Sequence, residues 1–146
     1  MTGGVPDLGA YEFLPTSVPP SLPSTPAAPA AGTTQVFMFG TDTVSKITWD
    51  PGSVVPTTVE VRRYSGVLPT GLSTGQSSMY FYTDVDITGS QPSSFTMQQF
   101  YIDPWQGFIP TEVVTRLGRT DASGTWILGP GSSVDIFNNV IKEDTL

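Results

Sequence analysis

Short segments in which apolar and polar residues alternate run through the chain, and most of them end at Gly, Pro, Asn or Asp. Residues 77–88 give the clearest pattern. One side of this segment would carry Met79, Phe81, Thr83, Val85 and Ile87, and the other side Tyr80, Tyr82, Asp84 and Asp86. Because side chains two positions apart point the same way on a strand, the pattern predicts a half-buried antiparallel strand.

Similar patterns predict strands at residues 35–39, 45–49, 57–64 and 93–102, and residues 112–117 lead from a loop into a further group. Helical periodicity is absent from every window longer than about ten residues, because Pro, Gly and β-branched residues interrupt it. Strands separated by turn signals predict an all-β fold, an antiparallel β-sandwich of about seven to nine strands. A β-barrel is the alternative, and the short, unevenly spaced segments favour the sandwich.

Residues 119–141 hold three apolar runs, around Trp126, at 134–137 and at 140–141, with turn-forming residues between them. Runs this short, separated by turn signals, predict a β-meander. Trp126 is the largest side chain of the segment, so we expect it to anchor the core. Trp49 lies inside a predicted strand and is expected in the core as well.

The composition fits one domain built from strands and turns. The chain has 146 residues, 38% of them hydrophobic and 13% charged, with 15 Gly and 14 Pro. A domain of this size buries on the order of two-thirds of its unfolded surface, which is enough for a real core.

Charge and missing residue types exclude several functions. The net charge is -7, and the basic residues form no cluster beyond Arg62 and Arg63, so we expect neither a nucleic-acid partner nor binding to an anionic membrane. The chain has no His and no Cys, which excludes Ser-His-Asp and thiol catalysis and imidazole-bound zinc. No apolar run approaches the roughly 20 residues of a membrane-spanning helix, so membrane insertion is not expected.

Proline divides the chain. Residues 15–31 contain six prolines and no charge, which predicts an extended, semi-rigid linker. We therefore expect three parts: residues 1–14, a Pro/Ala/Ser/Thr-rich linker at 15–32, and a folded module at 33–146.

The first part carries the heptapeptide Asp7-Leu-Gly-Ala-Tyr-Glu-Phe13. From its residues alone it is a disordered or edge-paired tag. It resembles, however, the closing segment of secreted bacterial right-handed parallel β-helix proteins. The resemblance implies that residues 1–14 are a remnant of a β-helix domain, and that the chain belongs to a longer exported protein whose signal peptide lies upstream.

The third part also bears a resemblance, carried by the order of residues 59–64, 69–72, 116–126 and 133–140. These motifs are similar to those of β-sandwich modules that follow β-helix and other domains in secreted Bacteroidetes proteins. Such modules usually precede a sorting signal of the type IX secretion system, whereas this chain stops at Leu146, before the final strand and signal that the resemblance leads us to expect. The resemblance implies an extracellular or cell-surface, non-catalytic accessory module: a spacer, cap or docking unit for the preceding domain.

Outward aromatic side chains give the alternative function. Tyr80 and Tyr82 on the predicted strand, with Trp105 and Phe108 in a nearby loop, have the character of a platform on which sugar rings stack. The alternative to the accessory role is thus a carbohydrate-binding module using Tyr80, Tyr82 and Trp105 against a cell-surface or matrix glycan. The simpler expectation is that the tyrosines pack beneath a neighbouring element.

Asp84 and Asp86 are the candidate metal ligands. On one strand face their β-carbons would lie about 7 Å apart, a spacing at which two carboxylates share Ca²⁺ or act as acid and base on a glycosidic bond. Calcium would need more oxygens, and Asp42, Asp50 and Asp103 are of the right type. A solvated strand face is the simpler interpretation, so we expect no cofactor and no enzyme. Residues 129–133 look like a phosphate loop but lack its Lys and helix, and we interpret them as a turn.

Overall fold

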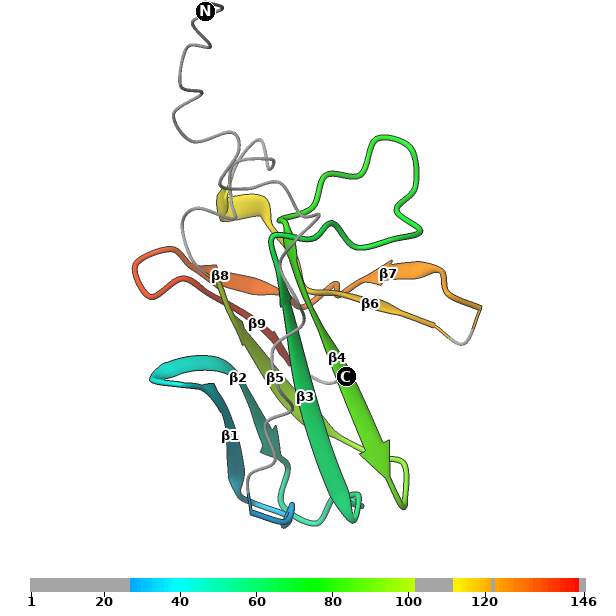
Figure 1. Ribbon diagram of the computed structural model, residues 1–146. Helices are drawn as coiled ribbons and strands as arrows, with labels where there is room; N and C mark the ends of the chain where they lie inside the picture. Colours follow the sequence, from blue (N-terminus) through cyan, green and yellow to red (C-terminus); the bar gives the residue numbers. More distant parts are fainter. Residues whose placement is uncertain (1–26, 102–111, 122, 145–146) are drawn as a thin grey trace, which may run out of the picture.

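The computed structural model describes residues 27–101, 112–121 and 123–144 (Figure 1). They form nine strands: β1 (Thr34–Phe39), β2 (Asp42–Trp49), β3 (Thr58–Ser65), β4 (Phe81–Thr88), β5 (Phe95–Phe100), β6 (Gly118–Thr120), β7 (Trp126–Leu128), β8 (Ser133–Asp135) and β9 (Val140–Asp144). One turn of 3-10 helix, η4 (Glu112–Val114), precedes β6. The prediction of an all-β chain with antiparallel strands is confirmed for these residues, which contain no α-helix.

The strands form one large sheet and two ribbons. The large sheet has five strands in the order β1-β2-β5-β9-β8, and β3-β4 and β6-β7 each pair as a separate two-stranded ribbon. Every pairing is antiparallel. Since β5 pairs with β2 on one side and β9 on the other, the centre of the large sheet joins residues roughly a third of the chain apart.

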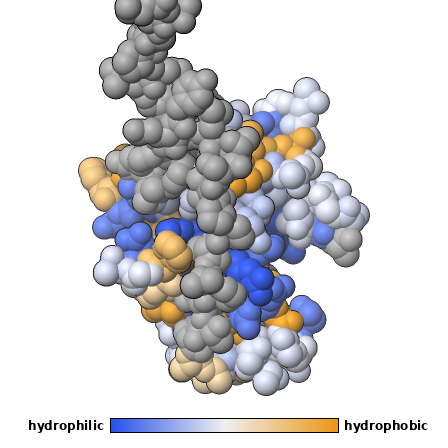
Figure 2. Space-filling model, in the orientation of Figure 1, coloured by the Kyte–Doolittle hydropathy of each residue, from blue (hydrophilic) through white to orange (hydrophobic). Residues whose placement is uncertain are grey.

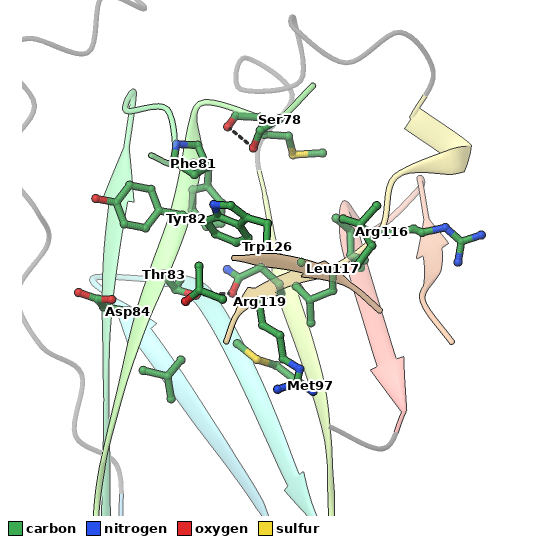
Figure 3. A pocket seen from close by; sticks show the side chains of 18 of the residues that line it. Ser78, Phe81, Tyr82, Thr83, Asp84, Met97, Arg116, Leu117, Arg119 and Trp126 are labelled. Carbon is green, nitrogen blue, oxygen red and sulfur yellow. Dashed lines mark hydrogen bonds between the residues drawn. The ribbon is translucent and has the colours of Figure 1, made fainter. Parts of the chain in front are cut away.

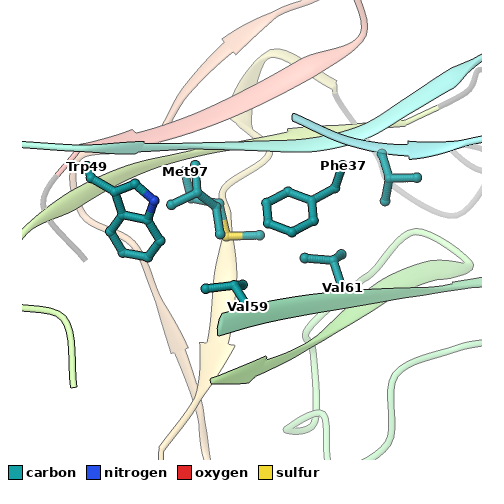
Figure 4. Close-up of a cluster of buried hydrophobic side chains, with 7 residues drawn as sticks. Phe37, Trp49, Val59, Val61 and Met97 are labelled. Atoms are coloured by element: carbon teal, nitrogen blue, oxygen red, sulfur yellow. The ribbon is translucent and has the colours of Figure 1, made fainter. Parts of the chain in front are cut away.

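The main core lies where β3 faces the large sheet (Figure 4). Val59 and Val61 of β3 point at Phe37, Trp49 and Met97 of the sheet, and all five are buried. This cluster confirms Trp49 as a core residue. Its indole Nε1 donates a 3.0 Å hydrogen bond to Oε1 of Gln35, which removes the cost of burying an unpaired donor.

The predicted strand at 77–88 is confirmed from Phe81 to Thr88. β4 alternates as expected, with Phe81 buried and Asp84 and Asp86 exposed. The strand starts at Phe81 because residues 66–80 form a loop that closes when the Gly66 N–H donates to the Tyr80 carbonyl, 2.8 Å away.

The meander prediction is wrong at one junction. β7 pairs with β6, whereas β8 pairs with β9 in the large sheet, so β7 and β8 belong to different sheets. The turn between them, residues 129–132, wraps around the buried carboxylate of Glu143 in place of forming a hairpin. The predicted meander is therefore divided between two sheets.

The prediction that Trp126 anchors the core is also wrong. Its side chain is half-buried and lies outside both clusters of buried hydrophobic residues. The second cluster is built instead from Met79, Phe81, Tyr101 and Ile141. The short β6-β7 ribbon holds Trp126 beside the core, at the edge of an open groove.

Candidate functional site

The outward face of β3-β4 carries three matched pairs of side chains. The register places Tyr64 opposite Tyr82, Arg62 opposite Asp84, and Glu60 opposite Asp86. The tyrosine rings stack, with centroids 4.6 Å apart and planes 5° from parallel. Tyr64 is the partner that the sequence analysis missed, because the register that places it opposite Tyr82 cannot be obtained from the alternation within either strand.

The stack changes what Tyr82 offers to a ligand. Partial burial raises the pKa of its phenol, and the nearby Tyr64 and Asp84 raise it further. The phenol thus remains a hydrogen-bond donor into alkaline solution. Because each ring covers one face of the other, Tyr82 presents a single ring face, a narrower platform than the predicted one.

Of the other aromatic residues predicted for the sugar platform, only Tyr80 belongs to the described part of the chain. Tyr80 lies in the loop before β4, where its carbonyl accepts the hydrogen bond from Gly66. Trp105, Phe108 and Asp103 lie outside the described residues. The sugar platform made of Tyr80, Tyr82 and Trp105 stays a prediction.

An arginine lies beside the predicted metal ligands. Nε of Arg62 is 4.0 Å from Oδ2 of Asp86, and its Nη2 is 3.5 Å from Oε2 of Glu60. Glu60 and Asp86 face each other across the two strands, and the guanidinium of Arg62 offsets the repulsion between their carboxylates. Asp42 lies 4.0 Å from Arg63, and Asp50 accepts a hydrogen bond from Ser94. In the described part of the chain no three acidic side chains gather in a metal-holding group, and Ca²⁺ binding stays a prediction.

A groove of about 1180 Å³ lies on the inward side of β4, between this strand, β5 and the β6-β7 ribbon (Figure 3). Trp126, Thr83, Met97 and Arg119 line it, and Tyr82 and Asp84 also border it, although their side chains point away from Trp126 in Figure 3. Sequence reasoning missed this site because it placed Trp126 in the core.

The turn at residues 129–132 does bind an anionic group, but an internal one. The Gly131 N–H donates to Oε1 of Glu143, 3.1 Å away, and the Ser132 hydroxyl donates to Oε2. Arg116 holds the outside of the turn through the carbonyls of Gly129 and Pro130. The prediction of a structural turn is confirmed, and its occupant is the side chain of Glu143, which is only 2% exposed.

The β8-β9 turn displays an aromatic side chain. Phe137 is 93% exposed, and Ile136 beside it is 38% exposed. Apolar residues project at the left edge of Figure 2, on the side where Figure 1 shows the β8-β9 turn. The turn itself is fixed, because Oδ1 of Asp135 accepts hydrogen bonds from the Phe137 and Asn138 N–H groups.

Comparison with protein-family models finds no match, and comparisons with curated proteins and with solved structures give no significant match. Among the residues that the structure describes, no helix has the length and apolar character needed to cross a membrane.

Proposed function

We propose that this chain is a non-catalytic accessory module of β-sandwich type within a longer secreted or surface protein, and that it docks onto the preceding domain of the same polypeptide. The five-stranded sheet would be one layer of the sandwich and the β3-β4 ribbon the start of the other. Extracellular location and export by a type IX system belong to this proposal and depend on the sequence resemblance.

The exposed Phe137 is the observation that carries the docking role. Its side chain is 93% exposed, and the backbone of the turn that carries it is held by hydrogen bonds from the Phe137 and Asn138 N–H groups to Asp135. Exposed apolar side chains gathered at a fixed position are typical of interaction surfaces. Burying a Phe side chain against a neighbour is worth about 1.5–3 kcal/mol, a useful anchor for a module that a linker already holds nearby.

The docking partner that the sequence favours is the end of a β-helix. The last coil of a solenoid leaves apolar side chains and backbone groups without a stacked neighbour, so such ends require a cap. A module joined to that end through residues 15–32 would meet it at high effective concentration.

The reading frame upstream of Met1 tests the proposal first, because it should encode repeating β-helix coils.

In the longer polypeptide, Phe137→Ser should reduce the protection of the module from hydrogen exchange. In the 146-residue chain the same change should leave Tm unaltered, since the ring makes little contact there. Val54, 51% exposed on another part of the surface, supplies the control Val54→Ser, which should change neither property. Equal protection in all three proteins, or an upstream frame without coils, would refute the docking role.

The stacked pair Tyr64 and Tyr82 favours carbohydrate binding as the second candidate function. Its rings stand beside Arg62 and Asp84, whose planar groups suit paired sugar hydroxyls. On a glycan array, binding that is lost in Tyr82→Ala and kept in Phe137→Ser would favour this function over docking.

A further inference from the structure

We propose that the free edge of β4 binds an extended segment of another polypeptide, in which apolar residues alternate with lysine or arginine and which adds to the β3-β4 ribbon as a further strand. Neither Ile136 nor Phe137 lines the groove beside this edge. The site is therefore distinct from the docking surface and does not depend on it.

The groove follows the edge of β4 that has no partner strand. Among the described residues β4 pairs only with β3, and the groove is lined by six residues of β4 and by none of β3 (Figure 3). The six come from both faces of the strand, because Tyr82 and Asp84 line the groove together with Thr83 and Val85. Side chains of both faces border one space only at a strand edge. The groove therefore opens along the side of β4 that faces away from β3.

Backbone groups of β4 point into this opening. The Gly66 N–H donates to the Tyr80 carbonyl. In an antiparallel pair, residues bonded to the partner strand alternate with residues whose N–H and C=O groups point away from it. By this alternation Thr83, Val85 and Ile87 direct their backbone groups away from β3. An edge of this kind is a template for an added strand.

The lining of the groove is apolar and incompletely covered. Val85 and Ile87 pack against the main core but are only partly buried. Val114 and Leu128, which also line the groove, are 66% and 51% exposed. An added strand would place alternate apolar side chains against these residues and remove both sets from water.

The size of the groove fits one strand. A strand residue in a stacked layer fills roughly 160 Å³, from a rise of about 3.4 Å, a strand spacing of about 4.8 Å and a sheet spacing of about 10 Å. The groove volume of about 1180 Å³ then corresponds to about seven residues. This number is close to the 8 residues of β4 itself.

The charge on the outward face of the ribbon favours a basic partner. Glu60, Asp84 and Asp86 share a single guanidinium, that of Arg62, so carboxylates are in excess on this face. Lysine or arginine on an added strand, opposite Asp84 and Asp86, would form cross-strand ion pairs.

Two arginines also line the groove, but both have partners. Arg116 donates to the backbone carbonyls of the turn at residues 129–132, and the charge of Arg119 lowers the pKa of Asp121. Residues 1–26, 102–111, 122 and 145–146 contain no Lys or Arg. These segments cannot supply a basic strand, which we therefore assign to another polypeptide.

The test uses the complete 146-residue chain and a synthetic peptide as long as β4, in which valine alternates with lysine. Calorimetry should show binding, and a peptide in which valine alternates with glutamate should bind about tenfold more weakly. In the complex, the N–H groups of Thr83, Val85 and Ile87 should gain protection from hydrogen exchange measured by NMR. Of two lysine peptides, one N-methylated on every valine and the other on every lysine, only one should bind, because only alternate N–H groups of an added strand face β4.

Leu128→Lys should weaken binding of the lysine peptide by about tenfold or more, because it places a charge in the apolar lining. Ile127→Lys is the matched control, since Ile127 is 42% exposed on the same strand and does not line the groove. Phe137→Ser should leave peptide binding unchanged, so failure of the docking role and failure of this proposal are distinguishable.

Asp84→Asn combined with Asp86→Asn should weaken binding severalfold, the loss of two exposed ion pairs. Asp144→Asn, on β9 of the large sheet, removes a carboxylate outside the groove lining and should leave binding unchanged.

Failure of the lysine peptide to bind would overturn the proposal, as would equal affinity for the two N-methylated peptides or equal losses in Leu128→Lys and Ile127→Lys. Protection of the Thr83, Val85 and Ile87 N–H groups without peptide would also overturn it. Such protection would assign the edge to the chain itself if it is independent of protein concentration, and to a second copy of the chain if it rises with concentration.

Discussion

Glu143 shows how one residue sets the local path of the chain. It stands on β9 opposite Met97 and is only 2% exposed. A carboxylate in such a place needs donors, and the N–H of Gly131 with the hydroxyl of Ser132 provides them. The requirement draws residues 129–132 inward and separates β7 from β8.

A double-mutant cycle measures this contact. A β-carbon at Gly129 would overlap the Glu143 carboxylate, so Gly129→Ala should be destabilising. Glu143→Ala should lower the free energy of unfolding by about 1–3 kcal/mol, because it leaves buried donors unpaired. In the Gly129→Ala, Glu143→Ala double variant the overlap is gone, and the total loss should be smaller than the sum of the two. Urea unfolding measures all three values, and strict additivity would contradict the contact.

The phenol of Tyr82 should titrate at higher pH than an exposed tyrosine. Its raised pKa means that the unfolded chain loses this proton first, so stability should be complete below the usual tyrosine pKa and fall as the pH rises through the folded value. Absorbance at alkaline pH follows the ionisation, and Tyr82→Phe should remove the late-titrating component. Because desolvation is the largest cause, Tyr64→Phe should keep most of the shift. A wild-type titration without a late component would contradict the raised pKa.

At the scale of elements, the β8-β9 hairpin depends on the side chain of Asp135. The Asn138 side-chain amide lowers the pKa of Asp135, and the Asn138 and Phe137 N–H groups lower it further. Asn139 then adopts a φ of +50°, a left-handed conformation that Asn tolerates better than most residues. The aromatic side chain at the tip is consequently presented by a turn with a defined shape.

Asp135→Ala should lower Tm at neutral pH, because the turn loses its acceptor. The depressed pKa of Asp135 implies stability that is present above the usual carboxyl pKa and is lost as the pH falls through the folded value. The difference in Tm between wild type and Asp135→Ala should therefore shrink in acid. Melting curves followed by circular dichroism from neutral to acidic pH measure it, and a difference that persists unchanged in acid would contradict the ionised turn. Asp86→Ala, on the outward face of β4, serves as the control.

At the scale of the whole molecule, two valines join the β3-β4 ribbon to the large sheet. Val59 and Val61 are each 2% exposed and contact Phe37, Trp49 and Met97 across the core (Figure 4). The ribbon has no hydrogen-bonded partner strand in the large sheet, so this apolar packing is the main contact between the two layers. A hydrogen bond from Thr83 to Gln99 and an ion pair between Arg63 and Asp42 add to it.

Val59→Ala and Val61→Ala should each lower the free energy of unfolding by about 2 kcal/mol, the value of the lost methyl groups together with the space they leave. Val36→Ala, at a 38% exposed position on β1, should cost much less. Urea denaturation at constant m-value measures the differences. Equal costs at Val36 and Val59 would contradict the assigned core.

Only some features of the candidate sites could be predicted from the sequence. Alternation at residues 81–88 correctly put Tyr82, Asp84 and Asp86 on an outward face, because side-chain direction on a strand depends only on neighbouring residues. The stacking of Tyr82 on Tyr64 and the approach of Arg62 to Asp86 depend on the register between β3 and β4. The groove at Trp126 was not predicted, since an indole inside a short strand has the same local signal whether it lies in the core or beside it.

The sequence by itself determined that the described chain is built of short antiparallel strands, and it excluded the chemistry of His and Cys. It also determined which side of β4 faces inward. Only the tertiary structure decided that β5 pairs with β9, that β7 and β8 separate, and that Trp126 borders a groove. The physical reason is that alternation and turn propensity act between neighbours, whereas strand partners are chosen by burial and hydrogen bonding between residues far apart in the chain.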